Sequence, residues 1–328
     1  MPAISVIILN WNGKHFLDDC LNAMRRQTFR DFETILVDNG STDGSAEYVR
    51  EHFPDVRLIA LSDNRGFPGG NIAGYEQAEG DLIVLLNNDT EADPAWLEQI
   101  YQASIRYPEV SSFASKMMYF DDRQRIENCG FDLGIECATR DRGRDELDGP
   151  AWGQDCPVFG ACAGAGAYRR SMLQEIGFLD PDFFVSYEDV DLSFRAQLFG
   201  YSCVYVSQAV VYHRYRATRG KAPFREAWYS QRNIEYVWLK NMPGSLLLRY
   251  FPQRILYEVG SALYFARRGA ATAFLGAKWR AFRDLPSLFR KRREIQRRKT
   301  ISNAQLRAMM AGSVFASKWR KLRNAGNR

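Results

Sequence analysis

Histidine and cysteine are scarce in this sequence, with three and six copies among 328 residues. The six cysteines include no C-x-x-C pair, and structural zinc sites usually combine closely spaced cysteine and histidine ligands. A zinc-binding module is therefore disfavoured. We expect the thiols to be reduced, as they are in the cytoplasm.

Long uncharged apolar runs are also lacking. No stretch reaches the roughly twenty apolar residues that a helix needs to cross a bilayer. The first residues, Met1 to Val6, show no basic segment followed by an apolar core, so no secretory leader is expected. Both absences favour a cytoplasmic protein.

Acidic residues are scarce at the C-terminal end. From Ala266 onward there are 18 Lys or Arg and two Asp or Glu, whereas the first 265 residues hold 26 basic and 37 acidic residues. This asymmetry predicts two regions with opposite electrostatic roles. We expect an α/β domain over residues 1–220 and a basic helical region over residues 221–328.

Short aliphatic runs followed by polar residues predict an α/β fold with a mainly parallel sheet. The runs Ile4–Leu9, Phe32–Val37 and Val56–Leu61 are the first three expected strands. The first run ends in Asn10-Trp11-Asn12-Gly13, which is not the G-x-G-x-x-G fingerprint of dinucleotide-binding domains. A dinucleotide site is thereby disfavoured.

The run Leu82–Leu86 predicts the central strand, buried on both faces. Its hydrophobicity stops at Asn87, Asn88 and Asp89, which places oxygen ligands at the carboxyl end of the strand, where open α/β sheets bind ligands. Oxygen atoms of this kind suit a divalent cation.

Two glycine-rich segments are ambiguous from their residues alone. The segment Ser62–Asn71 contains three glycines and Arg65, which suits a phosphate-binding loop or a flexible connection equally well. The segment Phe159–Ala167 is built almost entirely of small residues, which permits either close approach of a ligand or tight packing against a helix. Between them, the polar residues 121–155 are expected to form hairpins and a long loop.

A cluster of carboxylates begins an expected helix at Glu188. Carboxylates at a helix start can be structural caps, but Glu188, Asp189 and Asp191 are more than one cap requires. Beyond the next expected strand lies His213, which is either a packing residue or a ligand.

Five segments, in this order and spacing, resemble the family 2 glycosyltransferases over about residues 3–215. They are Val6–Asn12 (VIILNWN), Leu36–Ser45 (LVDNGSTDGS), Asn64–Phe67 (NRGF), Leu86–Asp89 (LNND) and Tyr187–Arg195 (YEDVDLSFR). Within that family the chain looks most like the bacterial rhamnosyltransferase-type branch, which builds surface polysaccharides. The resemblance implies a GT-A fold, a nucleotide-diphospho-sugar donor, Mg2+ or Mn2+, and inversion at the anomeric carbon.

The resemblance also implies roles for individual residues. Asp38 would accept a hydrogen bond from the pyrimidine ring, and Arg65 would lie near the nucleoside and the diphosphate. The nucleotide-sugar site so implied consists of Asn10, Asn12, Asp38, Asn39, Arg65, Gly66, Asn71, Asn88 and Arg195.

The implied metal site departs from the commoner family pattern. Asp89 matches the last carboxylate of the D-x-D motif, but Asn87 replaces the first, which leaves one formal negative charge. His213 aligns with a histidine that completes the metal site in some relatives. An amide oxygen can ligate a hard cation, and the phosphates of the nucleotide would complete the shell.

Asp189 matches the catalytic base of the family. An inverting transfer needs a base opposite the leaving diphosphate to take the proton of the acceptor hydroxyl. Glu188 and Asp191 would orient the acceptor, or would orient Asp189 and Arg195.

The C-terminal region interleaves aromatic and basic residues, as in Lys278–Arg283 and Phe289–Arg293. This pattern suits amphipathic helices on an anionic membrane surface, although a solvated basic face and nucleic-acid binding use the same charge. We favour the membrane over nucleic acid, since a lipid-linked acceptor would lie there.

The sequence thus predicts a cytoplasmic inverting glycosyltransferase, peripheral on the inner face of the cell membrane. It would move a sugar, with L-rhamnose as a candidate, from a dTDP- or UDP-sugar to a lipid-linked or oligosaccharide acceptor. The alternatives are a sugar-1-phosphate nucleotidyltransferase and a catalytically inactive nucleotide- or glycan-binding scaffold.

Overall fold

The computed structural model describes residues 1–214 and 223–313. The chain divides into two compact units. The first comprises Met1–Phe131, Asp141–Ala196 and Tyr201–Lys221, and the second comprises Asp132–Arg140, Gln197–Gly200 and Ala222–Arg328. A boundary near residue 220 was expected, but the two short segments that join the second unit were not.

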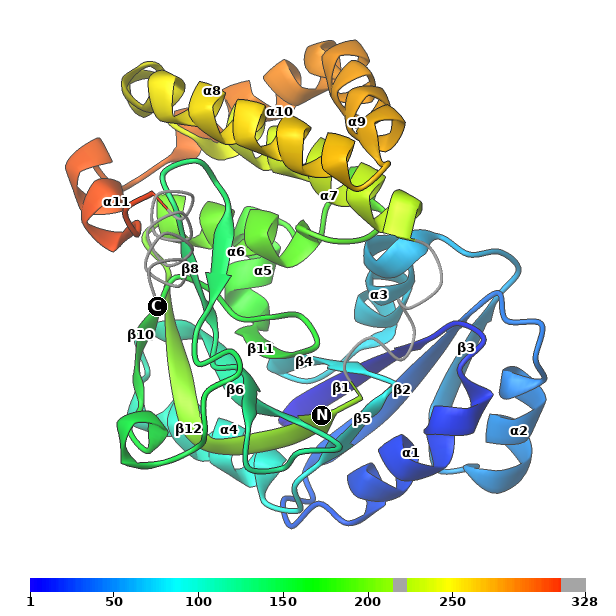
Figure 1. Ribbon diagram of the computed structural model, residues 1–328. Coiled ribbons are helices and arrows are strands. Elements are labelled where there is room, and N and C mark those ends of the chain that lie inside the picture. The colour runs from blue at the N-terminus through cyan, green and yellow to red at the C-terminus, as the bar shows by residue number, and fades with distance from the viewer. Residues whose placement is uncertain (215–222, 314–328) are drawn as a thin grey trace. The chain divides into compact units, whose positions relative to one another are not determined.

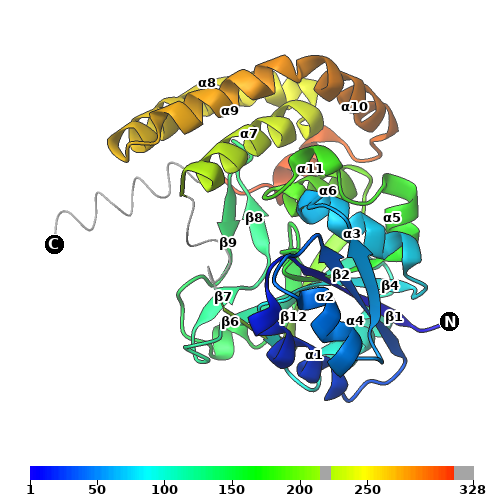
Figure 2. The same ribbon diagram turned by 90° about the vertical axis from the view of Figure 1, so that its right-hand side faces the viewer.

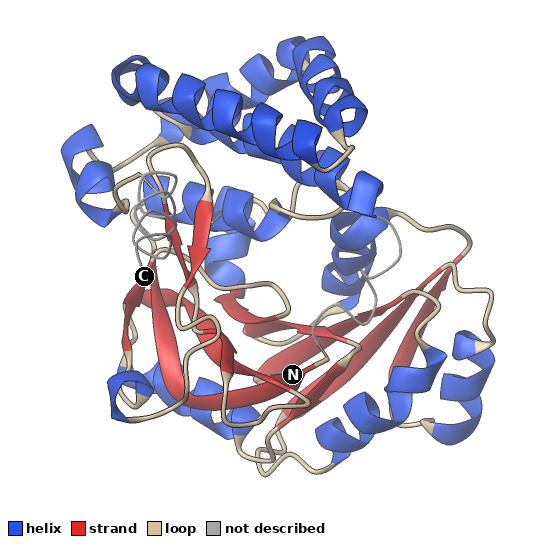
Figure 3. Cartoon of the chain, viewed as in Figure 1, coloured by secondary structure: helices blue, strands red, loops and turns tan. Residues whose placement is uncertain are grey.

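The first unit is built on one curved, mixed sheet, drawn in red in Figure 3. Its strand order is β10-β12-β6-β11-β4-β1-β2-β3, with β5 paired to β12 and β7 paired to β6. The strands are β1 (Ile4–Asn10), β2 (Phe32–Asn39), β3 (Arg57–Leu61), β4 (Leu82–Asn87), β5 (Thr90–Ala92), β6 (Val110–Tyr119), β7 (Ile126–Asn128), β10 (Cys156–Val158), β11 (Ala165–Arg169) and β12 (Ser202–His213). A separate hairpin pairs β8 (Phe131–Leu133) with β9 (Thr139–Asp141).

Strands β3, β2, β1 and β4 lie parallel, as their aliphatic runs predict. The register places Asn10 of β1 beside Asp38 of β2. On the other side of β1, Leu9 lies beside Asn87 of β4. Because parallel strands end at the same edge of a sheet, the polar residues that follow these strands are brought together there.

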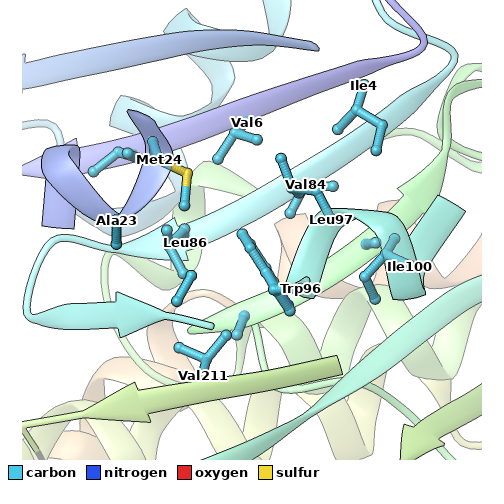
Figure 4. Close-up of a cluster of buried hydrophobic side chains, with 14 of the residues drawn as sticks. Ile4, Val6, Ala23, Met24, Val84, Leu86, Trp96, Leu97, Ile100 and Val211 are labelled. Carbon is cyan, nitrogen blue, oxygen red and sulfur yellow. The ribbon is translucent and has the colours of Figure 1, made fainter. Parts of the chain in front are cut away.

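Helices lie on both faces of the sheet (Figure 1). Helices α1 (Leu17–Arg25), α2 (Ser45–His52) and α4 (Trp96–Arg106) contribute to one continuous hydrophobic core together with Ile4, Val6 and Ile8 of β1. Figure 4 shows Trp96 of α4 among the aliphatic side chains of this core. Trp96 is fully buried, and its indole N–H donates to the Ser115 hydroxyl at 2.8 Å. Burial of this core is the main source of stability for the sheet.

The opposite face of the sheet is covered by α3 (Gly66–Gln77), which corrects one expectation. Most of the segment expected to be a glycine-rich loop is helical, from Gly66 onward. A Cβ atom on Gly74 would lie 2.6 Å from Cγ2 of Ile7, and one on Gly70 would overlap a methyl group of Leu9. The glycines at 70 and 74 therefore allow the helix to pack closely on β1, and this packing outweighs their poor helix propensity.

The remaining elements of the first unit connect or edge the sheet. They are η1 (Lys14–Phe16), η2 (Pro150–Trp152), α5 (Arg170–Ile176), η3 (Pro181–Phe183) and α6 (Glu188–Leu198), whose last two residues belong to the second unit. His213 was expected beyond the end of a strand, but it lies within one, because β12 continues to His213 with an irregularity between Val206 and Val210.

The second unit is helical (Figure 2). Its helices are α7 (Pro223–Asn241), α8 (Gly244–Arg267), α9 (Ala271–Arg283), α10 (Leu285–Arg298) and α11 (Asn303–Met309). Helix α7 packs against α9 and α10, and α8 packs against α9. Within residues 1–214 and 223–313, no helix is long and apolar enough to cross a membrane.

A buried network of charges joins three helices of the second unit. The guanidinium of Arg254 on α8 donates to Oε1 of Glu235 on α7 at 2.6 Å and forms an ion pair with Oε1 of Glu258 at 2.7 Å. It also donates to the backbone carbonyl of Glu136 at 2.7 Å. Lys278 of α9 pairs with both carboxylates. Arg254 is 3% exposed, so this network is buried between the helices.

Candidate active site

The first group of expected site residues is a hydrogen-bonded cluster at the ends of β1 and β2. The Asn10 amide donates to Asp38 Oδ1 at 3.1 Å and accepts from Asn88 Nδ2 at 2.6 Å. The second Asp38 oxygen accepts from the Ser41 N–H at 3.1 Å. Asn12 lies above the cluster with φ +51°, and its side chain accepts from the Thr42 N–H at 2.8 Å. The fold therefore brings Asn10, Asn12, Asp38 and Asn88 together.

Ser41 was not among the residues expected in the site. Its hydroxyl accepts from the Asn10 amide at 3.3 Å and from the Asn12 N–H at 2.9 Å. This contact joins the two turns that follow β1 and β2. Ser41 lies within the LVDNGSTDGS motif, and its place in that motif is the only feature of the sequence that could have indicated a role in the site.

The second group surrounds the turn that leads into α3. Asn39, 2% exposed, donates to Asn64 Oδ1 and to the Gly66 carbonyl, both at 3.1 Å. Its Oδ1 accepts from the Arg65 N–H at 2.9 Å. Asn39 thus holds the backbone of the turn, while the half-exposed Arg65 side chain contacts Asp63 at 3.6 Å.

Two residues of the expected donor site have positions that argue for structural roles instead. Asn71 is 1% exposed and donates to the Phe67 carbonyl one turn earlier in the chain. Arg195 is 6% exposed, and it donates to the carbonyls of Ile176, Gly177 and Phe178 as well as to Asp191. These bonds engage the Arg195 side chain within the protein and tie it to the segment before α6.

The third group lies at the end of β4. Asp89 Oδ1 lies 3.1 Å from His213 Nε2, and Asn87 Nδ2 lies 3.5 Å from the same nitrogen. The backbone of this turn is held by the Thr90 hydroxyl, which donates to the Asn87 carbonyl at 2.6 Å. Asn87, Asp89 and His213 are therefore adjacent, from segments more than 120 residues apart in the chain.

Glu127 is a member of this group that sequence reasoning missed. Its carboxylate accepts from His213 Nδ1 at 2.7 Å, and it is 4% exposed. Burial alone would lower the pKa of His213, but hydrogen bonds to Asp89 and Glu127 outweigh that effect and raise it to about 10. Glu127 lies on β7 in the polar region 121–155, where no local pattern distinguishes it from the other charged residues.

The donor set of this group fits a divalent cation. It combines a carboxylate, an amide and an imidazole whose other nitrogen is held by a carboxylate, an arrangement common around metal ligands. Among the described residues, no group of three or more His, Cys, Asp or Glu side chains could hold a metal ion alone. The amide of Asn87 and oxygens of a bound ligand would therefore have to complete the coordination shell.

The fourth group is at the start of α6. Asp189 Oδ1 accepts from the Val190 N–H at 2.8 Å, and Oδ2 accepts from the Ala163 N–H at 3.3 Å. Asp191 is fully buried and pairs with Arg195 at 2.9 Å. Glu188 is 6% exposed beside Asp189.

The small residues 160–166 bring the third and fourth groups together. The Asn87 N–H donates to the Gly164 carbonyl at 2.9 Å, and the preceding residue, Ala163, donates to Asp189. A Cβ atom on Gly160 would overlap the Ser193 hydroxyl of α6. Tight packing, one of the two interpretations of this segment, is therefore observed. The residue that contacts Asp189 and the residue that contacts Asn87 are neighbours in the chain.

Comparisons with known proteins agree with this architecture. The sequence pattern of the family Glycosyl transferase family 2 matches residues 5–177. This covers more than half of the chain, and the protein therefore belongs to glycosyl transferase family 2, as the sequence motifs predicted.

Curated relatives are distant. An O-antigen biosynthesis protein of Myxococcus xanthus is 27% identical over 241 residues, which cover 70% of this chain and 18% of that protein. The N-acetylglucosaminyl-diphospho-decaprenol L-rhamnosyltransferase of Mycobacterium tuberculosis is 24% identical over 247 residues, 67% of this chain and 78% of that protein. The chain spans 18%, 27% and 54% of the lengths of three similar curated proteins, most of which are much longer.

Solved structures support the fold. A mannosyltransferase from Pyrobaculum calidifontis, in complex with GDP-Man and Mn2+, has a TM-score of 0.52 at 17% identity, covering 84% of this chain and 74% of that one. A fragment of S. aureus TarS in complex with UDP has a TM-score of 0.54 at 16% identity, covering 90% and 88%. The expected GT-A fold with additional C-terminal helices is thereby confirmed.

Proposed function

We propose that the protein is an inverting glycosyltransferase that moves a sugar from a nucleotide-diphospho-sugar to a lipid-linked or growing polysaccharide acceptor. The observation that carries this proposal is the junction at Ala163 and Gly164. These two residues contact Asp189 and Asn87, respectively, and so join a metal-binding group to a carboxylate at a helix start. Such a transfer needs both groups at one reacting centre.

The donor would bind along the carboxyl edge of the parallel strands. Asp38, held by Asn10 and Ser41, offers carboxylate oxygens to the N–H of a pyrimidine ring. The guanidinium of Arg65, half exposed at the start of α3, would contact the diphosphate. These assignments favour a UDP- or dTDP-sugar, and the name of the mycobacterial relative makes L-rhamnose a candidate sugar.

A divalent ion, Mg2+ or Mn2+, would be held by Asp89, Asn87 and His213. When bound, it would neutralise charge that develops on the departing diphosphate. Mn2+ in the Pyrobaculum mannosyltransferase structure supports the choice of a divalent metal. Glu127 would keep the His213 ring oriented through Nδ1.

Asp189 would act as the general base. The acceptor hydroxyl oxygen attacks the anomeric carbon from the face opposite the diphosphate, and the bond from that carbon to the diphosphate oxygen breaks. The acceptor proton moves to the Asp189 carboxylate, which the N–H groups of Ala163 and Val190 hold in place. Glu188 beside it would orient the acceptor.

The donor and base assignments are tested by two measurements. Thermal shift with UDP, dTDP, GDP and CMP, with and without Mn2+, should show a metal-dependent rise for UDP or dTDP alone. Asp189→Asn should keep that shift and the fold but lose at least a hundredfold in transfer rate. Asp31→Asn, an exposed carboxylate at the start of β2, is the matched control and should transfer normally.

Two results would favour other functions. No shift with any nucleotide would favour the inactive scaffold, and near-normal turnover by Asp189→Asn would overturn the base assignment. Release of diphosphate from a nucleoside triphosphate and a sugar-1-phosphate would instead indicate a nucleotidyltransferase.

The helical unit would hold the enzyme on the inner face of the cell membrane. Large apolar side chains that are at least 45% exposed are concentrated on α8, α9 and α10: Leu248, Phe251, Ile255, Leu256, Val259, Leu263, Tyr264, Leu275, Trp279, Phe282 and Phe289. Exposed arginines accompany them, including Arg267, Arg268 and Arg283. Exposed apolar patches of this extent mark interaction surfaces, and the positive charge favours anionic lipids.

Vesicle sedimentation tests this surface directly. The protein should co-sediment with vesicles that contain phosphatidylglycerol and remain in solution with pure phosphatidylcholine. Trp279→Glu, which is 63% exposed in the parent, should weaken sedimentation without loss of helix content. Equal sedimentation of Trp279→Glu and the parent would remove α9 from the proposed contact.

A further inference from the structure

The backbone immediately before Asp189 has an uncommon conformation. Phe184, Ser186 and Tyr187 have φ angles of +61°, +69° and +69°, in the left-handed region that residues other than glycine rarely adopt. Helix α6 begins at the next residue, Glu188. A conformation of this kind persists only where the surroundings hold it.

The turn at the start of α3 provides that hold. The Phe67 N–H donates to the Phe184 carbonyl at 2.6 Å. Gly66 has φ +72°, and a Cβ atom there would overlap the same carbonyl and lie 2.7 Å from Cδ2 of the Phe184 ring. Only glycine therefore allows both the turn and the close approach.

The turn is itself fixed to the end of β2. Asn39 donates to the Gly66 carbonyl and accepts from the Arg65 N–H, as described above. Asn64 Oδ1 accepts from the Gly66 N–H at 2.8 Å. Asn39 follows Asp38 directly. Strand β2, which carries the carboxylate proposed to bind the pyrimidine ring, therefore also anchors the turn that contacts Phe184.

The far end of the same segment is anchored separately. Arg195 holds the carbonyls of residues 176–178 and pairs with Asp191, one helical turn before it on α6. The Phe184 contact lies between these two anchors, in the segment that leads into Asp189.

We propose that Asn39, Gly66 and Phe184 are positioning residues that set the placement of Asp189 for catalysis. The inference rests on the proposed function for the role of Asp189, but the geometric link itself is independent of any substrate. The family resemblance places Asn39 and Gly66 in the nucleotide site. In this proposal they position the general base, Asp189, and do not contact the nucleotide.

The test compares two glycine substitutions of equal backbone strain. Gly66→Ala introduces the overlap with Phe184. Gly269→Ala is the matched control, because Gly269 has φ +70° but no atom within 4 Å of a new Cβ. Hydrogen–deuterium exchange of the full chain, affinity for UDP and dTDP, and release of dTDP from dTDP-L-rhamnose or UDP from a UDP-sugar are measured for both variants.

For Gly66→Ala we expect exchange at residues 185–191 to quicken at least tenfold and kcat to fall at least tenfold, while nucleotide Kd changes less than threefold. Gly269→Ala should match the parent in all three. Should Gly66→Ala fail to fold, Asn39→Asp provides the second variant. The aspartate keeps the oxygen that accepts from the Arg65 N–H but loses the N–H that donates to the Gly66 carbonyl. We expect smaller changes in exchange and kcat, in the same direction as for Gly66→Ala.

Two outcomes would overturn the inference. Unchanged exchange at residues 185–191 would show that the contact does not hold the segment. A large rise in nucleotide Kd with unchanged exchange would make Gly66 a nucleotide contact only. If the parent releases no nucleoside diphosphate, the proposed function fails, yet the exchange experiment still decides whether the turn positions α6.

Discussion

Replacing Arg254 with methionine tests whether the buried charge network stabilises the helical unit. Methionine keeps much of the side-chain volume but removes the cation. Glu235 and Glu258 would then share Lys278 alone, and the Glu136 carbonyl would lose its donor. The contacts of the guanidinium with the Trp238 and Tyr257 rings, 5.5 and 5.2 Å from their centroids, would also be lost.

The expected cost is large because removal of one partner leaves a buried charge uncompensated. Such losses are about 3–5 kcal/mol, against a typical domain stability of about 5–15 kcal/mol. For a unit of this size the midpoint of thermal unfolding should fall on the order of 10 °C. Urea unfolding at neutral pH, followed by far-UV circular dichroism, measures the difference in free energy.

Arg249→Met is the control on the same helix. Arg249 is exposed, so its replacement should change the unfolding free energy by less than about 0.5 kcal/mol. The double variant Glu235→Gln with Arg254→Met restores charge balance and should be more stable than Arg254→Met alone. If Arg254→Met unfolds at the same urea concentration as Arg249→Met, the network does not stabilise the unit and the reasoning is wrong.

Two further perturbations test other parts of the structure. Burial raises the pKa of Glu235, but the charges of Arg254 and Lys278 outweigh burial and lower it from 4.5 to about 2. Its stabilising contribution is therefore complete above pH 4.5 and is lost as the pH falls towards 2, so the stability advantage of the parent over Glu235→Gln should shrink across that interval in acid urea titrations. A constant difference over that interval would contradict the assignment. Trp96→Phe should cost about 1–3 kcal/mol, because it leaves the Ser115 hydroxyl without its buried donor and removes ring volume from the core. Trp96→Phe with Ser115→Ala should recover part of that loss, and no recovery would assign the cost to packing alone.

The parallel half of the sheet was predictable because its strands are continuous aliphatic runs with polar ends. Hydrophobic patterning fixes β1, β2 and β4, and the parallel register then requires their terminal residues to meet. The clusters around Asp38 and Asp89 follow from that rule together with the family motifs.

Other features depend on tertiary contacts that local patterns do not encode. The segment after Arg65 looked like a loop because glycine disfavours helices, yet packing of Gly70 and Gly74 on β1 stabilises α3. The small residues of β11 were compatible with a strand or a ligand-binding segment, and nothing local in them predicts that the strand is inserted antiparallel between β4 and β6. Glu127 reaches His213 from a polar hairpin region, and only the folded chain reveals the pairing.

The division of the chain has a consequence for how its parts can be separated experimentally. Asp132–Arg140 and Gln197–Gly200 belong to the helical unit although they are encoded within the catalytic half. The backbone N–H groups of Thr300 and Ile301 bond the carbonyl of Leu198, and Arg254 bonds that of Glu136. A deletion after residue 221 would therefore remove the donors to the Leu198 carbonyl at the end of α6 and the donor to the Glu136 carbonyl. Loss of activity in such a truncated protein would not distinguish damage to the helix that bears Asp189 from loss of the proposed membrane contact. Point substitutions on the exposed faces of the helices separate the two effects more clearly.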